Sequence, residues 1–219
     1  GLLFAVLPAL AAPRFNVTFP AEVSTEPLNG RLLLIVSPGG EQEPRLQVNW
    51  DMDAIPFFGM DVEGWKPGQR QVFDRKSAGF PIHSLDDLPP GDYRVQAVLN
   101  RYERFARSDG HTLLLPPDQG EGQAWSRKPG NLYSKPQIIR VEPKRHGRVV
   151  LVLDQKIPAA EAFEKKESEY NRYLRIRSER LSKFWGRDIY LGAWVRLPWG
   201  FDQHPEARYP LVIAHGHFP

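Results

Sequence analysis

The chain has 219 residues, and its 29 Lys and Arg against 26 Asp and Glu give a formal charge of only +3. This near balance argues against nucleic acid as the partner. The absence of cysteine excludes disulfides, Cys-ligated metals and thiol nucleophiles. The 21 prolines favour short strands joined by rigid turns over long helices.

The first twelve residues are apolar and uncharged, and they precede Pro13 and Arg14. They are fewer than the roughly 20 residues that a helix needs to cross a bilayer. Ala9-Leu10-Ala11 fits the small-x-small cleavage pattern of a secretory signal, so we expect residues 1–12 to be a signal-peptide remnant. We therefore expect a secreted or periplasmic bacterial protein that is not stably inserted in a membrane after the signal is cleaved. The alternative is an N-terminal apolar strand packed in the core.

Residues 13–155 alternate short apolar runs with turn residues, which predicts an immunoglobulin-like β-sandwich in a mainly β chain. Turn chemistry such as Asn29-Gly30 and Pro89-Pro90-Gly91 separates the runs. Residues 142–147 predict a hairpin-like turn between the last two strands. The expected strands are Phe15–Phe19, Arg31–Val36, Arg45–Asn49, Arg70–Phe73, Tyr93–Asn100, Thr112–Leu115, Gln137–Val141 and Arg148–Leu153.

The segment from Leu85 to Ala97 resembles the entry to the penultimate strand of immunoglobulin-like and fibronectin-like domains. In those domains a tyrosine packs at the corner, and its hydroxyl bonds to backbone upstream. The resemblance gives Tyr93 this structural role.

After residue 155 the pattern changes, so we expect a domain boundary and a helical linker over residues 156–172. Pro158–Tyr170 is the helix candidate, because Pro lies in its first turn and charges alternate along it. Tyr173–Ser178 and Ile189–Leu197 predict a second hairpin around a turn at 185–188. The unbroken apolar run Leu211–Ala214 predicts a strand buried on both faces.

Two patterns near the end of the chain have the sequences Leu-Pro-Trp-Gly-Phe (197–201) and Arg-Tyr-Pro-Leu-Val-Ile-Ala-His-Gly (208–216). Together with the preceding sandwich they resemble the secreted α/β-hydrolase esterases around enterochelin esterase, feruloyl esterase and esterase D. The resemblance implies that residues 173–219 begin a truncated α/β-hydrolase domain. It also implies an oxyanion-hole loop formed by the backbone of His215, Gly216, His217 and Phe218, with His217 where the family usually has a second glycine.

The nucleophile motif of that fold, G-x-S-x-G, occurs nowhere in the sequence. The resemblance therefore places the whole Ser-His-Asp/Glu triad beyond this chain, leaves no catalytic residue within it, and predicts that the fragment is inactive. The implied substrate is a small-molecule or oligomeric ester, and no cofactor is expected.

Two other functions remain open. His215 and His217 alternate after an apolar run, as in some zinc hydrolases, but the remaining histidines are scattered on predicted turns. In the other alternative, the chain is a non-catalytic secreted binding module whose functional part is the sandwich. Separately, three tryptophans near Gly/Pro turns are candidates for stacking on sugar rings or aryl groups of a substrate, and packing in a core or between domains is the structural alternative; they are Trp65, Trp125 and Trp199.

Overall fold

The computed structural model of the chain describes residues 14–49, 51, 53–117, 124–142, 147–159 and 166–214. The predicted signal remnant at residues 1–12 lies outside them. The chain divides into two compact units. Unit 1 comprises the residues up to Glu103 together with Leu114–Ala159, and unit 2 comprises Arg104–Leu113 together with the residues from Ala160 onwards.

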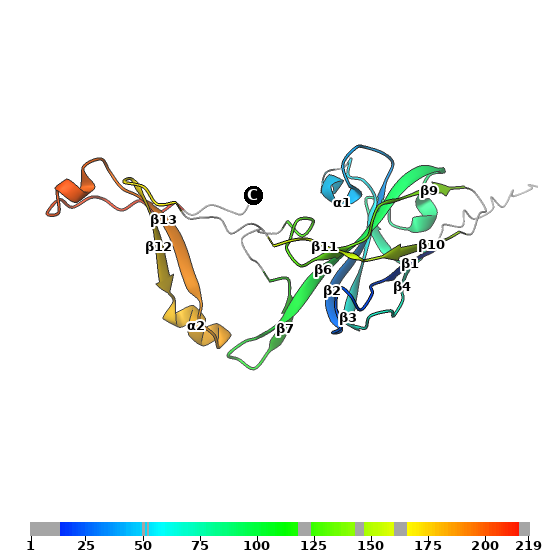
Figure 1. Ribbon diagram of the computed structural model, residues 1–219, viewed down its shortest axis with the longest axis horizontal. Coiled ribbons are helices and arrows are strands. Elements are labelled where there is room, and N and C mark those ends of the chain that lie inside the picture. The colour runs from blue at the N-terminus through cyan, green and yellow to red at the C-terminus, as the bar shows by residue number, and fades with distance from the viewer. Residues whose placement is uncertain are drawn as a thin grey trace, which may run out of the picture. The chain divides into compact units, whose positions relative to one another are not determined.

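Unit 1 is built from two β-sheets (Figure 1). In the larger sheet the strand order is β11-β8-β6-β2-β3-β5, and β7 and β9 also pair with β6. Its strands are β2 (Leu28–Ser37), β3 (Phe57–Trp65), β5 (Ala78–Phe80), β6 (Gly91–Ala106), β7 (Thr112–Leu115), β8 (Leu132–Tyr133), β9 (Gln137–Val141) and β11 (Gln155–Lys156). The smaller sheet has the order β10-β1-β4, with β1 (Arg14–Thr18), β4 (Gln71–Phe73) and β10 (Arg148–Val152).

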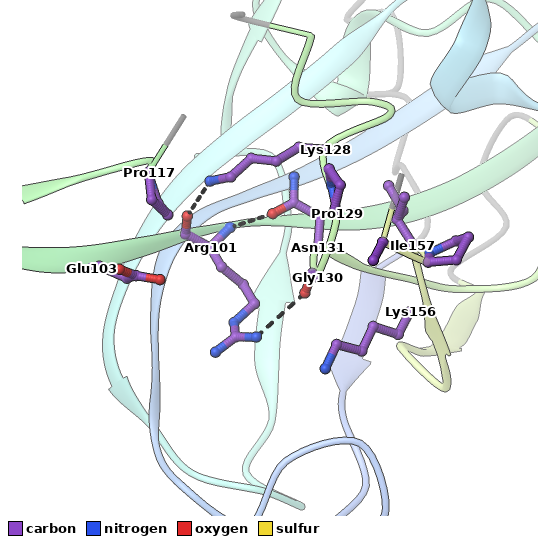
Figure 2. Close-up of a pocket in the computed structure, with 11 residues that line it drawn as sticks. Arg101, Glu103, Pro117, Lys128, Pro129, Gly130, Asn131, Lys156 and Ile157 are labelled. Carbon is purple, nitrogen blue, oxygen red and sulfur yellow. Dashed lines mark hydrogen bonds between the residues drawn. The ribbon is translucent and has the colours of Figure 1, made fainter. Parts of the chain in front are cut away.

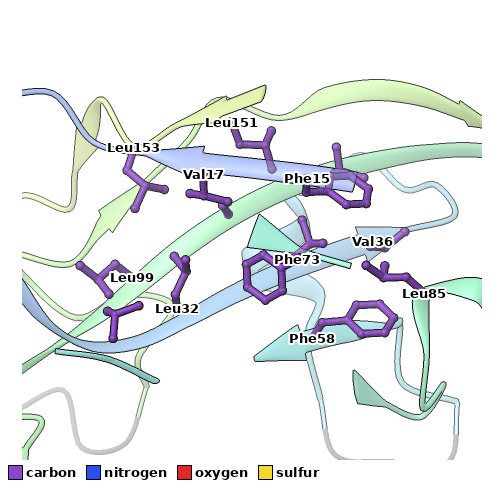
Figure 3. Packing of buried hydrophobic residues seen from close by; sticks show 14 of the residues in the cluster. Phe15, Val17, Leu32, Val36, Phe58, Phe73, Leu85, Leu99, Leu151 and Leu153 are labelled. Atoms are coloured by element: carbon purple, nitrogen blue, oxygen red, sulfur yellow. The ribbon is translucent and has the colours of Figure 1, made fainter. Parts of the chain in front are cut away.

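The core lies between these two sheets, as Figure 3 shows. Alternate residues of a strand point to the same face, and in both sheets one such set is apolar and buried. Phe15 and Val17 of β1 face inward, as do Leu32, Leu34 and Val36 of β2. The two buried faces form one hydrophobic cluster, so unit 1 has the face-to-face packing of a β-sandwich. The prediction of a mainly β chain is confirmed.

Most of the predicted strands are present, but two predictions about this region are wrong. Arg45–Asn49, expected as a strand, instead contains the short helix α1 (Pro44–Gln47), which begins with proline in its first turn. Proline is pre-organised for that position and donates no ladder hydrogen bond. The predicted hairpin around residues 142–147 is also absent, because β9 pairs with β6 whereas β10 pairs in parallel with β1 of the other sheet.

The predicted tyrosine corner is confirmed. Tyr93 is buried at the start of β6, directly after the 3₁₀ helix η1 (Leu85–Asp87) and the Pro89-Pro90 turn. Its hydroxyl donates a hydrogen bond to the carbonyl oxygen of Pro89, with an O···O distance of 2.8 Å. Burial raises the pKa of Tyr93 above its ordinary value of 10.0.

Replacing Tyr93 by phenylalanine is expected to lower the free energy of unfolding by about 1 kcal/mol at neutral pH, because the hydrogen bond to Pro89 is lost. The raised pKa means that the folded state holds the phenolic proton more tightly than the unfolded state does. This contribution to stability is present below pH 10 and is lost as the pH rises through the folded-state pKa. Urea denaturation at neutral pH and above pH 10 should therefore show a smaller alkaline loss for the variant; an unchanged loss would contradict this role.

Unit 2 contains an antiparallel pair of strands, β12 (Asn171–Arg177) and β13 (Tyr190–Arg196), in a register that pairs Asn171 with Arg196. The predicted hairpin partners are thus confirmed, but their connection is the helix α2 (Glu179–Trp185) rather than only a turn. Ser178 accepts a hydrogen bond from the backbone N–H of Leu181 at the start of α2, and Gly186 ends the helix with a φ of 61°. These are standard helix start and stop signals.

The expected start of a hydrolase domain is not found in unit 2. Leu211, Val212 and Ile213 form no strand, and each is at least 80% exposed. A strand buried on both faces needs neighbours in a covered sheet, and among the described residues no strand pairs with this segment. The 3₁₀ helix η2 (Phe201–Gln203) precedes it.

The predicted linker helix Pro158–Tyr170 includes residues 160–165, which lie outside the described residues, while residues 158 and 159 are described and are not helical. Its last five residues, 166–170, are described and are not helical. In the part of the chain that the structure describes, no helix is long and apolar enough to cross a membrane.

Candidate functional site: an aromatic groove on the larger sheet

The larger sheet is apolar on its outer face as well as on its core face. Ile35 of β2, Phe57 of β3 and Val98 of β6 alternate with the core residues of the same strands, and they form a second buried cluster. The partly buried residues packed against this cluster are Val48, Ile55, Phe80, Trp125 and Tyr133. The sheet therefore carries apolar residues on both faces. A sheet that packs on a single core needs them on one face only.

One end of this outer face is covered by α1. The backbone N–H of Arg45 donates to Gln96 Oε1 over 3.0 Å, and its guanidinium lies 4.5 Å from the centre of the Tyr133 ring. Arg45 Nε also donates to Glu43 Oε2 over 2.7 Å. Burial opposes ionisation of Glu43, but hydrogen bonds from Gln96 and Arg45 lower the pKa of its carboxyl below the usual 4.5. This network fixes α1 on the sheet.

The rest of the outer face is hollowed into a groove of about 370 Å³, within the size range of small-molecule sites. Four aromatic side chains contribute to its walls, and the rings of two of them, Phe57 and Phe80, have centroids 5.9 Å apart. The complete lining consists of Arg31, Leu33, Phe57, Gly59, Ala78, Gly79, Phe80, Asn100, Tyr102 and Trp125.

The groove has a polar end built from β2, β3 and β6. Arg31 Nη1 donates to Asp61 Oδ1 over 3.0 Å, and the guanidinium lies over Gly59, where an added Cβ would be 2.9 Å from its nitrogens. Burial, together with the carboxylate of Asp61, raises the pKa of Tyr102, while Arg31 acts in the opposite direction. A phenol, a guanidinium and a carboxylate thus lie close together beside the aromatic rings.

A buried asparagine anchors this groove from behind. Asn131 is fully buried, and its Nδ2 donates to Asn100 Oδ1 over 3.2 Å and to the carbonyl oxygen of Trp125 over 2.8 Å. Its Oδ1 accepts from the backbone N–H of Arg101. Two lining residues from separate segments, Asn100 and Trp125, are therefore held by one side chain.

The chemistry of the groove is suited to binding. Among its described lining residues there is no serine, cysteine, histidine or carboxylate, so they provide no pair of nucleophile and general base. They provide flat apolar rings beside hydrogen-bonding groups.

The structure does not describe the loop that the sequence predicts as a site. The predicted oxyanion loop, His215, Gly216, His217 and Phe218, lies outside the described residues, and so do the two proposed zinc ligands in it. No group of three metal-ligating side chains occurs among the residues that the structure describes.

The three tryptophans have three different environments. Trp65 is 1% exposed in the sandwich core, where its indole N–H donates to the carbonyl oxygen of Gln69. Trp199 is 79% exposed in unit 2. Trp125 lines the aromatic groove.

Phe57, Phe80 and Tyr102 were not predicted as site residues. A signal was present for the first, because in Phe57–Trp65 apolar residues occupy both alternating positions at the start of the strand. The sequence around Phe80 and Tyr102 contains no such signal, since no local pattern indicates that these residues lie beside Phe57.

Comparisons with known proteins identify no family for this chain. No protein family profile matches it, and no curated protein matches it. Among solved structures, a "putative adhesin" from Bacteroides ovatus is similar over 100% of this chain and 78% of its own, at 8% sequence identity and a TM-score of 0.30.

The resemblance to the secreted α/β-hydrolase esterases is therefore wrong. No protein family profile and no curated protein supports a hydrolase family for this chain. The central pattern of the resemblance also fails structurally, because residues 211–213 are exposed and unpaired instead of forming a buried strand. The short motifs that suggested it occupy only a few positions near the end of the chain.

Proposed function

We propose that this chain is a non-catalytic binding module whose β-sandwich holds its ligand in the aromatic groove on the outer face of the larger sheet. The observation that carries the proposal is the combination of Phe57, Phe80, Tyr102 and Trp125 with Arg31 in one groove of a rigid sheet. Sites on strands are positioned more accurately than sites on loops. Location outside the cytoplasm stays a prediction from residues 1–12.

The ligand class that this lining favours is a neutral carbohydrate. A sugar ring presents C–H groups on its faces and hydroxyls around its edge, so it needs a flat apolar surface beside groups that donate and accept hydrogen bonds. Trp125 and Phe57 supply the apolar surface, and Arg31, Asn100 and Tyr102 supply polar groups. Aromatic rings with a polar tip combine both properties.

A glycan array probed with the complete 219-residue chain tests this proposal. We expect binding to at least one neutral oligosaccharide, and we expect Trp125→Ala to weaken that binding by about 30-fold, the effect of losing one aromatic anchor of about 2 kcal/mol. The matched control is Trp199→Ala, which removes an exposed tryptophan of unit 2 and should bind as the wild type does. An array without any bound glycan, or equal binding by Trp125→Ala, would refute the proposal.

A further inference from the structure

Unit 1 has a second pocket, separate from the aromatic groove in its lining and in its charge. It has a volume of about 450 Å³ and lies where β6, β11 and the 128–131 turn meet (Figure 2). Three cationic side chains, Arg101, Lys128 and Lys156, line it with a single carboxylate, that of Glu103.

The side chains of Arg101 and Lys156 both lie beside Gly130. An ideal Cβ placed on Gly130 would be 3.8 Å from Arg101 Nη1 and 4.0 Å from Lys156 Cε. Gly130 has a φ of 84°, which a residue with a side chain rarely adopts. The carbonyl oxygen of Gly130 accepts a long hydrogen bond from Arg101 Nη1, with an N···O distance of 3.4 Å (Figure 2). Among the described residues, neither Arg101 nor Lys156 forms an ion pair.

The turn that holds these groups is tied to both neighbouring strands. The backbone N–H of Gly130 donates to the carbonyl oxygen of Ile157 over 2.9 Å. The backbone N–H of Ile157 donates to the carbonyl oxygen of Asn131, also over 2.9 Å. The ammonium of Lys128, which is 4% exposed, donates to the carbonyl oxygen of Arg101 over 2.9 Å. The backbone of the turn is thus fixed before a ligand arrives, which lowers the entropy cost of binding.

We infer that this pocket binds a phosphate monoester through Arg101 and Lys156. Such a group carries about −1.5 to −2 charges at neutral pH and has three acceptor oxygens, and the side chains of Arg101 and Lys156 each offer it one positive charge. Arginine and lysine are common phosphate ligands. A volume of about 450 Å³ accommodates a small organic molecule in addition to the phosphate. This site is independent of the proposed carbohydrate groove.

Calorimetric titration of the complete chain with glycerol 2-phosphate tests the inference. We expect saturable binding, and we expect Lys156→Gln and Arg101→Gln each to weaken it about fivefold, as for one solvent-screened ion pair. Glu103→Gln should instead tighten binding about threefold, because it removes a repelling carboxylate. Lys66→Gln, which removes an exposed charge that does not line the pocket, should leave binding unchanged.

Three further titrations test which anion the pocket binds and whether it acts separately from the aromatic groove. Inorganic phosphate and 2-hydroxyethyl sulfate should bind more weakly than glycerol 2-phosphate. The Trp125→Ala variant should bind glycerol 2-phosphate as the wild type does, even if carbohydrate binding is absent. The inference is overturned if glycerol 2-phosphate shows no saturable binding, or if Lys66→Gln weakens binding as much as Lys156→Gln does. Equal binding of inorganic phosphate would overturn the assignment to an ester, and equal binding of the sulfate would overturn the assignment to a dianion.

Discussion

Replacing Phe15 by alanine lowers the free energy of unfolding of unit 1 by about 3–5 kcal/mol, the cost of removing a buried aromatic ring and leaving a cavity. Phe15 is fully buried in β1, the central strand of the smaller sheet. It belongs to the cluster that joins the two sheets (Figure 3). The loss is therefore expected to affect both sheets and not β1 alone.

Urea denaturation followed by circular dichroism measures this effect. The control is Ile138→Ala in β9, whose side chain is 79% exposed; it should stay within about 0.5 kcal/mol of the wild type. If Phe15→Ala were as stable as Ile138→Ala, the two sheets would not share one core, and the β-sandwich description of unit 1 would fail.

Replacing Asn131 by alanine is expected to lower the free energy of unfolding by about 3 kcal/mol. Its side chain makes hydrogen bonds with the backbone N–H of Arg101, with Asn100 Oδ1 and with the carbonyl oxygen of Trp125. The truncation leaves these partners buried and unsatisfied, at about 1–3 kcal/mol for each group that water does not reach. Because Asn131 lines one pocket and anchors the other, binding in both should weaken.

The matched control is Asn171→Ala at the exposed start of β12, which should change stability by less than about 0.5 kcal/mol. Chemical denaturation gives the stability, and the glycan array and the titration with glycerol 2-phosphate give the binding. An Asn131→Ala variant with unaltered stability would show that water or a rearranged backbone satisfies the three partners, and it would remove the rigid link between the pockets.

The sequence predicts the parts of the fold that depend on local pattern. Alternation places Phe15 and Val17 on one face of β1, and it does the same for the core residues of β6. The Pro89-Pro90-Gly91 turn before Tyr93 is likewise a local signal, and the hydrogen bond to Pro89 is present. In these cases a single strand or turn contains all the information that the prediction needs.

Features that depend on which strands meet could not be predicted in this way. β10 lies close to β9 in sequence but pairs with β1, more than 130 residues away. The groove combines Arg31, Phe57, Phe80, Tyr102 and Trp125 from five separate segments, and no short window contains two of its walls. Strand register and pairing are set by packing across the sheet rather than by local propensity.

The esterase resemblance shows the limit of short motifs in physical terms. The apolar run at 211–214 is compatible with a buried strand, but burial requires neighbouring strands and a covering layer. Among the described residues, none of the three sheets, β12-β13 included, contains this run. Apolarity alone therefore does not specify a strand.

The most direct test of the account is to locate the bound carbohydrate by nuclear magnetic resonance of the isotope-labelled chain, recorded with and without a saturating glycan identified on the array. The account predicts that the largest shift changes occur at the Trp125 indole N–H and at the backbone amides of Arg31, Gly59, Gly79 and Asn100, all of which line the groove. Unchanged signals at these residues, with the largest changes in β12 and β13 or around Gly130, would contradict the assignment of the groove as the ligand site.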